Sequence, residues 1–352
     1  MQKRKFDFDD VLIEPADISD ISSRSEINCR YSDGYFPLFT APMDTVIDDR
    51  NSEIFKGNKI RVIKPRTDSN TSISKDPVEF KSYGIDDFIK TFLENDHLED
   101  EMYALIDVAN GHMQRLLDIV KESKKKYGDS LKLMVGNIAN PKTYSTFSEA
   151  GADLIRIGIG NGGGCLTTVQ TGVGYPMASL ISECYEISLA LDNPALIVAD
   201  GGFKKYSDII KALAIGADYV MLGSILNKSL ESAGDTYLAN IKHDGWTEPG
   251  EKVNQYLEET RKSFLGGTKM FKKFRGMSTK DAQKSMGKTV LKTSEGVTRI
   301  QPVEYTLDKW VENFESYLKS AMSYSNAKDL HSFIGQAKWN LITEGSFNRF
   351  NK

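Results

Sequence analysis

The sequence has no large excess of either charge. Its 45 lysine and arginine residues nearly balance 49 aspartate and glutamate residues, and the formal net charge is −4. Proteins that hold nucleic acid or anionic membranes through a general electrostatic surface carry a basic excess. We therefore expect no nucleic-acid partner and no membrane partner, and local groups would have to hold any small anionic ligand.

Long apolar runs and paired cysteines are also missing. The opening residues, "MQKRKFDFDDVLIEP", contain no apolar leader segment, and no apolar stretch reaches the length that crosses a bilayer. Cys29, Cys165 and Cys184 form an odd set without C-x-x-C spacing, which argues against a disulfide scaffold and fits a reducing compartment. The four histidines are scattered without metal-ligand spacing. We expect a cytoplasmic protein.

What the sequence does contain is a series of short, continuous apolar runs separated by amphipathic stretches. Continuous runs of this kind are typical of parallel strands buried on both faces. The runs predict a single-domain α/β protein, a (β/α)8 TIM barrel, with an open doubly wound sheet as the alternative. The eight runs lie at 36–42, 60–65, 79–85, 103–109, 132–138, 154–160, 195–201 and 219–224.

Two segments fall outside this repeat. Residues 236–267 are polar and follow the last predicted strand, so we interpret them as an insertion that carries its own helix. Residues 274–300 are rich in glycine, serine and lysine, which indicates a mobile active-site flap.

The carboxyl ends of barrel strands carry catalytic groups. The loops after the last two strands, "ADGG" and "LGS", hold Asp200, Gly202, Gly223 and Ser224. An aspartate there can accept hydrogen bonds from a ribose diol, and glycines let backbone N–H groups approach a phosphate; the alternative is two ordinary glycine turns. Other polar residues follow earlier strands: Lys64, a solvated lysine or an anion contact, and Asp107, Asn110 and Asn137.

The stretch "IRIGIGNGGGCLTTVQTGVGYP" (155–176) surrounds one cysteine with glycines. Its G-x-G-x-x-G spacing is no dinucleotide fingerprint, because glycines and a proline prevent a helix from following directly. A lone cysteine is usually a small buried hydrophobe. Here closely spaced backbone N–H groups would stabilise a thiolate, so Cys165 is a candidate nucleophile. Glu295, in the flap, is either a general acid or base or a solvated loop residue.

The loop "GIGNGGGCLTTVQTGVGYP" resembles the catalytic cysteine loop of the IMP dehydrogenase and GMP reductase family. The segments "FDFDDVLIEP", "APMDTV", "ADGG", "GADYVMLGS", "FRGMS" and "SEG" follow in the order of that family. The resemblance implies a (β/α)8 barrel, a homotetramer and a purine mononucleotide as substrate. The chain has no room for CBS modules and no Arg-Tyr pair in its flap, and both features make it more similar to GMP reductase than to IMP dehydrogenase.

The resemblance implies NADPH-dependent reductive deamination of GMP to IMP and ammonia. Cys165 would attack purine C2, with Thr167, Glu295 and Lys64 as further catalytic residues. NADPH would lie near Lys64, Asp107, Asn110 and Asn137. The nucleotide would contact Asp200, Gly201, Gly202, Gly223, Ser224, Gly276, Met277 and Ser278. Gly158, Gly160 and Cys165 are candidates for a monovalent cation site, K+.

Departures from the family pattern leave alternatives open. Phe274 stands where many relatives have a tyrosine that reaches the phosphate, and Asn161 replaces the proline usual in the cysteine loop. One alternative is therefore a deoxy- or otherwise modified guanine nucleotide as substrate. The others are an IMP dehydrogenase that oxidises IMP to XMP with NAD, and a non-catalytic purine-nucleotide-binding barrel.

Overall fold

The computed structural model describes residues 4–66, 72–97, 101–241, 247–285 and 296–350. Its centre is an eight-stranded parallel sheet in the order β2-β9-β8-β7-β6-β5-β4-β3. A parallel bridge between Phe39 and Arg61 joins the two end strands, and Thr40 N–H donates to the Arg61 carbonyl at 2.9 Å. The sheet therefore closes into the predicted barrel, which excludes the open doubly wound alternative.

Each predicted apolar run overlaps one barrel strand. The strands are β2 (Leu38–Thr40), β3 (Val62–Lys64), β4 (Glu79–Tyr83), β5 (Met102–Asp107), β6 (Leu131–Ile138), β7 (Leu154–Ile157), β8 (Leu196–Asp200) and β9 (Tyr219–Leu222). Side chains such as Phe39, Phe80 and Leu105 fill the barrel interior. Alternate residues pack outward against the helices, and burial on both faces explains why the runs are continuous.

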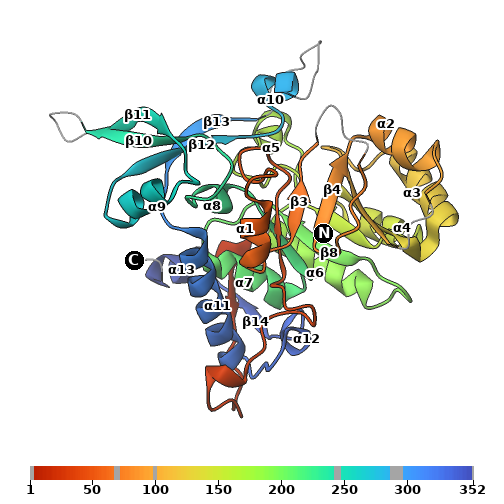
Figure 1. The fold of residues 1–352 in the computed structure, drawn as a ribbon. Helices are drawn as coiled ribbons and strands as arrows, with labels where there is room; N and C mark the ends of the chain where they lie inside the picture. Colours follow the sequence, from red (N-terminus) through yellow and green to blue (C-terminus); the bar gives the residue numbers. More distant parts are fainter. Residues whose placement is uncertain (1–3, 67–71, 98–100, 242–246, 286–295, 351–352) are drawn as a thin grey trace.

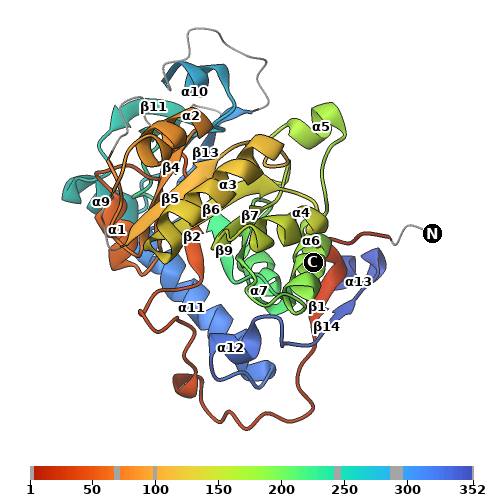
Figure 2. The same ribbon diagram turned by 90° about the vertical axis from the view of Figure 1, so that its right-hand side faces the viewer.

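Helices cover the outside of the barrel (Figure 2). They are α1 (Ser52–Gly57), α2 (Ile85–Phe88), which continues as a π-helical turn (Ile89–Leu93), α3 (Gln114–Tyr127), α4 (Pro141–Glu149), α6 (Met177–Ser188), α7 (Tyr206–Ile215) and α11 (Leu307–Tyr324). In α3, buried Leu116, Ile119, Val120 and Ser123 recur at helical spacing. Of the residues described between β3 and β4, none forms a helix.

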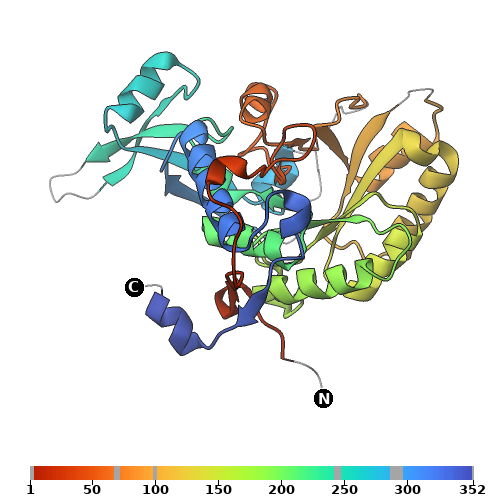
Figure 3. The same ribbon diagram turned by 90° about the horizontal axis from the view of Figure 1, so that it is seen from below.

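A second, antiparallel sheet stands beside the barrel (Figures 1 and 3). Its order is β11-β10-β12-β13, from the strands β10 (Thr236–Ile241), β11 (Thr247–Val253), β12 (Met270–Arg275) and β13 (Thr298–Pro302). The sequence of 236–267 predicts only a helix, which is α9 (Glu258–Leu265). The polar, partly exposed strand "TEPGEKV" has none of the apolar alternation that marks a strand. Helix α10 (Lys280–Ser285) follows β12.

The remaining elements lie at the two ends of the barrel. Short helices α5 (Thr167–Thr171) and α8 (Ser224–Asn227) follow β7 and β9 at the carboxyl end. At the opposite end, β1 (Val11–Ile13) pairs with β14 (Trp339–Leu341), near α12 (Leu330–Phe333) and α13 (Glu344–Phe350) (Figure 2). Within the described ranges, no helix has both the length and the apolar composition of a bilayer-spanning segment.

Aromatic packing on α11 generates a stability prediction. Phe314 is fully buried, and its ring lies parallel to that of Trp310 with centroids 5.6 Å apart. The Phe314→Ala variant leaves a cavity and should lower the free energy of unfolding by about 3–5 kcal/mol. Tyr324 is 65% exposed on the same helix, so Tyr324→Ala should change it by less than about 1 kcal/mol. Urea unfolding of both variants checks this, and equal losses would contradict it.

Candidate functional site

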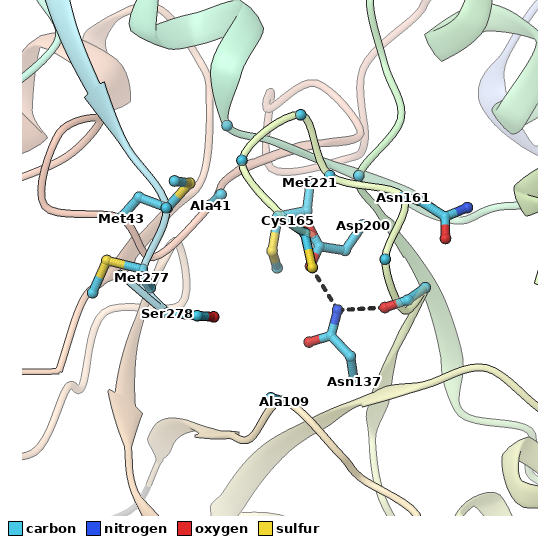
Figure 4. A pocket seen from close by; sticks show the side chains of 18 of the residues that line it. Ala41, Met43, Ala109, Asn137, Asn161, Cys165, Asp200, Met221, Met277 and Ser278 are labelled. Carbon is cyan, nitrogen blue, oxygen red and sulfur yellow. Dashed lines mark hydrogen bonds between the residues drawn. The ribbon is translucent and has the colours of Figure 1, made fainter. Parts of the chain in front are cut away.

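A pocket lies where the carboxyl ends of the barrel strands meet the cysteine loop and the start of the flap (Figure 4). It brings together residues from β5 to β9 that are distant in sequence. The predicted site residues among its lining are Asp107, Asn137, Gly158, Gly160, Cys165, Thr167, Asp200, Gly201, Gly202, Gly223, Ser224, Gly276, Met277 and Ser278.

Three predicted site residues are not placed in this lining. Lys64 Nζ instead lies 2.6 Å from Asp49 Oδ1 and 3.6 Å from Glu79 Oε1. Asn110 uses its side-chain oxygen locally and accepts a hydrogen bond from the His112 backbone at 3.0 Å. Glu295 lies outside the described residues.

The cysteine loop has a shape that depends on glycine. Gly160 has φ +80°, and a Cβ there would lie 1.7 Å from Oγ1 of Thr168, so no other residue fits. Cys165 N–H then closes a turn by donating to the Gly162 carbonyl at 2.9 Å. On the far side, Cys165 bridges to Gly296, and Val297 N–H donates to the Gly164 carbonyl at 3.1 Å. The returning flap segment thus holds the loop.

Of the three thiols, only that of Cys165 faces the pocket. It donates a hydrogen bond to Oγ1 of Thr167 at 3.3 Å. Cys29 and Cys184 are buried elsewhere. Burial raises the pKa of Cys29 to about 11 and raises the pKa of Cys184 further, so both remain neutral thiols.

A buried charged cluster forms the floor of the pocket. Arg156, on β7, donates through Nη1 to Asp107 at 2.8 Å and through Nε to Asp200 at 3.0 Å. The three side chains are 10%, 13% and 17% exposed. Asn137 Nδ2 adds hydrogen bonds to Asp200 at 2.7 Å and to the Gly158 carbonyl at 2.8 Å. One guanidinium therefore links the ends of the three strands β5, β7 and β8.

Arg66 extends this cluster toward the outer part of the pocket. Its Nε lies 3.2 Å from Oδ2 of Asp107 but makes no hydrogen bond, although it is buried. Burial would raise the pKa of Asp107, but the Arg156 and Arg66 guanidinium groups lower it below its usual value. Asp107 is thus a carboxylate that pairs with two arginines.

Arg156 and Arg66 are functional candidates that the sequence-based predictions missed. A signal for Arg156 was available, because an arginine inside the apolar strand "LIRI" must be paired when it is buried. Arg66 follows β3 by two residues and carries no such signal. The apolar part of the lining includes Ala41, Met43 and Met221. In Figure 4, Met43, Met277 and Ser278 lie on one side of the space into which the Cys165 sulfur points.

The described residues contain no cluster of side chains of the kind that usually holds a metal ion. Among them, no group of three or more His, Cys, Asp or Glu side chains is placed to hold one. At the candidate K+ position, the Gly158 carbonyl already accepts the Asn137 hydrogen bond.

The charged cluster predicts a pH-dependent loss of stability. Arg156→Met leaves the buried Asp200 carboxylate without its cation and Asp107 with Arg66 alone, and should lower the free energy of unfolding by about 3–5 kcal/mol at pH 7. The loss should shrink at pH 5, because carboxylates without a cation have raised pKa values and regain stability as they take up protons. In the wild type, the lowered pKa of Asp107 keeps its contribution constant between these pH values.

Urea unfolding at pH 7 and pH 5 measures this difference. The matched control is Arg115→Met, since Arg115 and its partner Asp86 are 58% and 86% exposed. Arg115→Met should lower the free energy of unfolding by less than about 1 kcal/mol at either pH. A loss in Arg156→Met that is the same at both pH values would contradict the assignment.

Comparison with known proteins shows which protein family the chain is similar to. Residues 98–244 match a family model described as the IMP dehydrogenase / GMP reductase domain. The chain is 27% identical to GMP reductase of Shewanella pealeana, with 100% of this chain and 99% of that protein aligned. It is also 27% identical to human GMP reductase 2, with 97% and 95% aligned.

The match to a dehydrogenase has a higher sequence identity than the matches to the two reductases, but it covers a shorter part of the chain. The chain is 34% identical to inosine-5'-monophosphate dehydrogenase of Chlorobaculum parvum over 238 residues. The match covers 68% of this chain but only 44% of that protein, so the chain spans less than half the length of this relative.

Proposed function

We propose that this chain, which belongs to the IMP dehydrogenase and GMP reductase family, catalyses the NADPH-dependent reductive deamination of GMP or a related guanine nucleotide. The observation that carries the proposal is the Cys165 thiol, which faces a pocket lined by the two glycine loops expected to hold a nucleotide. The full-length relatives named GMP reductase support the reductase branch. We further propose a cytoplasmic homotetramer.

In the proposed reaction, Sγ of Cys165 forms a bond to purine C2. Thr167, whose hydroxyl lies 3.3 Å from that sulfur, and Glu295 move protons so that the 2-amino group leaves as ammonia. Bound NADPH supplies the hydride that reduces C2. The S–C2 bond then breaks, the Cys165 sulfur takes up a proton to restore the thiol, and the products are IMP and NADP+.

The other pocket residues would bind and orient. Oδ2 of Asp200 accepts from Arg156 and Asn137, and the other carboxylate oxygen would accept from a ribose hydroxyl. Gly201, Gly202, Gly223 and Ser224 would contact the phosphate, and Gly276, Met277 and Ser278 the base.

The outer part of the pocket suits the carboxamide of a nicotinamide. Such a group needs both a donor and an acceptor, and Arg66 and Asp107 offer them side by side. The unsatisfied, buried Nε of Arg66 is the observation that supports this fit. We propose Asp107, Asn137 and Arg66 as cofactor contacts, with Arg66 in the role that the resemblance gives to Lys64.

An absorbance assay of the purified protein tests the proposed reaction. With GMP and NADPH, we expect oxidation of NADPH with release of an equal amount of ammonia. Cys165→Ala should lower the rate at least about 10³-fold while nucleotide binding persists, because the nucleophile is lost but the pocket is not. Cys29→Ala should keep turnover, since that thiol is buried elsewhere.

Other outcomes would replace the proposal. Reduction of NAD in the presence of IMP would assign the chain to the dehydrogenase branch, which the Chlorobaculum relative favours. Silence in both assays with nucleotide binding intact would indicate a non-catalytic barrel. A panel that includes deoxyguanosine monophosphate would identify a changed substrate.

Lys64, the last residue of β3, and Arg66, two residues later, give a paired prediction about the cofactor. Arg66→Met should raise the KM for NADPH about tenfold or more, because a charge-assisted contact is lost. Lys64→Met should change it less than about twofold, since Lys64 is held by Asp49 and Glu79. Steady-state kinetics with GMP held saturating measures both values. A larger effect from Lys64→Met would restore Lys64 as the cofactor contact.

A further inference from the structure

Arg299 lies beside the cysteine loop, in a position fixed by strand pairing. It is on β13, directly opposite Phe274 on β12. Its guanidinium carbon lies 4.8 Å from the centre of the Phe274 ring, a cation–π distance. Val297, two residues before it, donates to the Gly164 carbonyl and accepts from Gly276 N–H at 2.9 Å. Backbone hydrogen bonds therefore hold this end of β13 against the loop.

Two hydrogen-bonding groups face one small space above Gly163. A methyl group placed on Gly163 would lie 3.3 Å from Oγ of Ser224 and 3.5 Å from Nη2 of Arg299. Neither of these two atoms has a hydrogen-bond partner among the described residues. The other guanidinium nitrogens make long contacts, Nη1 to the Gly163 carbonyl at 3.3 Å and Nε to Gln301 at 3.2 Å.

Charge sets Arg299 apart from the other cations around the pocket. The others each pair with a carboxylate: Arg66 with Asp107, Arg156 with Asp107 and Asp200, Lys64 with Asp49, and Arg275 with Asp44. Arg299 has no carboxylate partner in the part of the chain that the structure describes. An exposed guanidinium of this kind, next to a free hydroxyl, is suited to bind an anion with several oxygens.

We propose that Arg299 and Ser224 clamp the phosphate of the substrate nucleotide above Gly163. This assignment rests on the proposed function for the identity of the nucleotide, but not for the presence of a phosphoryl site. A phosphate carries up to two negative charges near neutral pH and several acceptor oxygens. The guanidinium donates to one side of it and the Ser224 hydroxyl to another. Phe274, which has no hydroxyl, supports the guanidinium through its ring.

The clamp binds the phosphate of the substrate rather than that of the cofactor. Ser224 directly follows Gly223 after β9, and both line the pocket. A Cβ on Gly223 would lie 3.0 Å from the sulfur of Met43. The proposed cofactor contacts Arg66 and Asp107 belong to the strands β3 and β5 and their following loops.

The first experiment uses inorganic phosphate as the probe. At constant ionic strength, replacing chloride by phosphate should raise the melting temperature of the wild type, and Arg299→Gln should lose most of that increase. Lys273→Gln is the matched control, because Lys273 is on the neighbouring strand β12 and pairs with Ile300 rather than with Arg299. Arg299 is exposed on an edge strand, so the variant should fold. An equal response of wild type and Arg299→Gln overturns the proposal.

Calorimetric titration with GMP and with guanosine identifies the source of the phosphate. Arg299→Gln should weaken GMP binding about tenfold and guanosine binding less than about twofold, since guanosine lacks the charged contact. The GMP affinity of Arg299→Lys should lie between those of the wild type and Arg299→Gln, because lysine keeps the charge but lacks the paired N–H donors of the guanidinium. Equal weakening of both ligands overturns the assignment. A change confined to the ratio of NADPH to NADH affinity would give the clamp to the cofactor and overturn it as well.

These results are distinguishable from failure of the proposed function. If the chain turns over neither GMP nor IMP but the phosphate response still depends on Arg299, the clamp stands and the proposed reaction falls. If GMP is reduced and the Arg299 variants match the wild type, the reaction stands and the clamp falls.

Discussion

The site depends on one interaction, the pairing of Arg156 with Asp107 and Asp200. A guanidinium in the barrel interior costs several kcal/mol to desolvate, and here two carboxylates, one from β5 and one from β8, offset that cost. The pairing also has a geometric effect, because it fixes the side chains at the ends of β5, β7 and β8 relative to one another. The loops that follow β5, β7 and β8 into the pocket each start from one of those fixed ends.

The charge pattern above this cluster divides the pocket into two parts. Around Asp107 and Asp200 the charges compensate each other, which leaves a polar but nearly neutral surface for uncharged groups such as a ribose or a carboxamide. At Ser224 and Arg299 the positive charge is uncompensated among the described residues. A mononucleotide has the same division, with its charge at one end and neutral polar groups along the rest. The proposed site would accordingly orient such a ligand as well as bind it.

The barrel and its family were predictable from the sequence because both depend on local signals. The apolar runs that become β2 to β9 are long enough to show burial on both faces, and "GIGNGGGCLTT" is distinctive. The second sheet was not predictable, because β11 is exposed and polar. Arg156 was missed since its partners lie about fifty residues away in either direction, at Asp107 and Asp200. Lys64 and Asn110 lie at or just after the carboxyl ends of strands, where site residues are expected. Lys64 nevertheless pairs with Asp49, and Asn110 accepts from the His112 backbone.

The attachment of the cysteine loop to the flap has a consequence for the order in which the site is completed during synthesis. The last barrel strand, β9, ends at Leu222, but the bridge from Cys165 requires Gly296. Because translation proceeds from the amino terminus at about 5–20 residues per second, the ribosome exposes all eight strands several seconds before it exposes the segment that holds the loop. During that interval the cysteine loop is present on a nascent barrel without the backbone contacts that Gly296 and Val297 later supply.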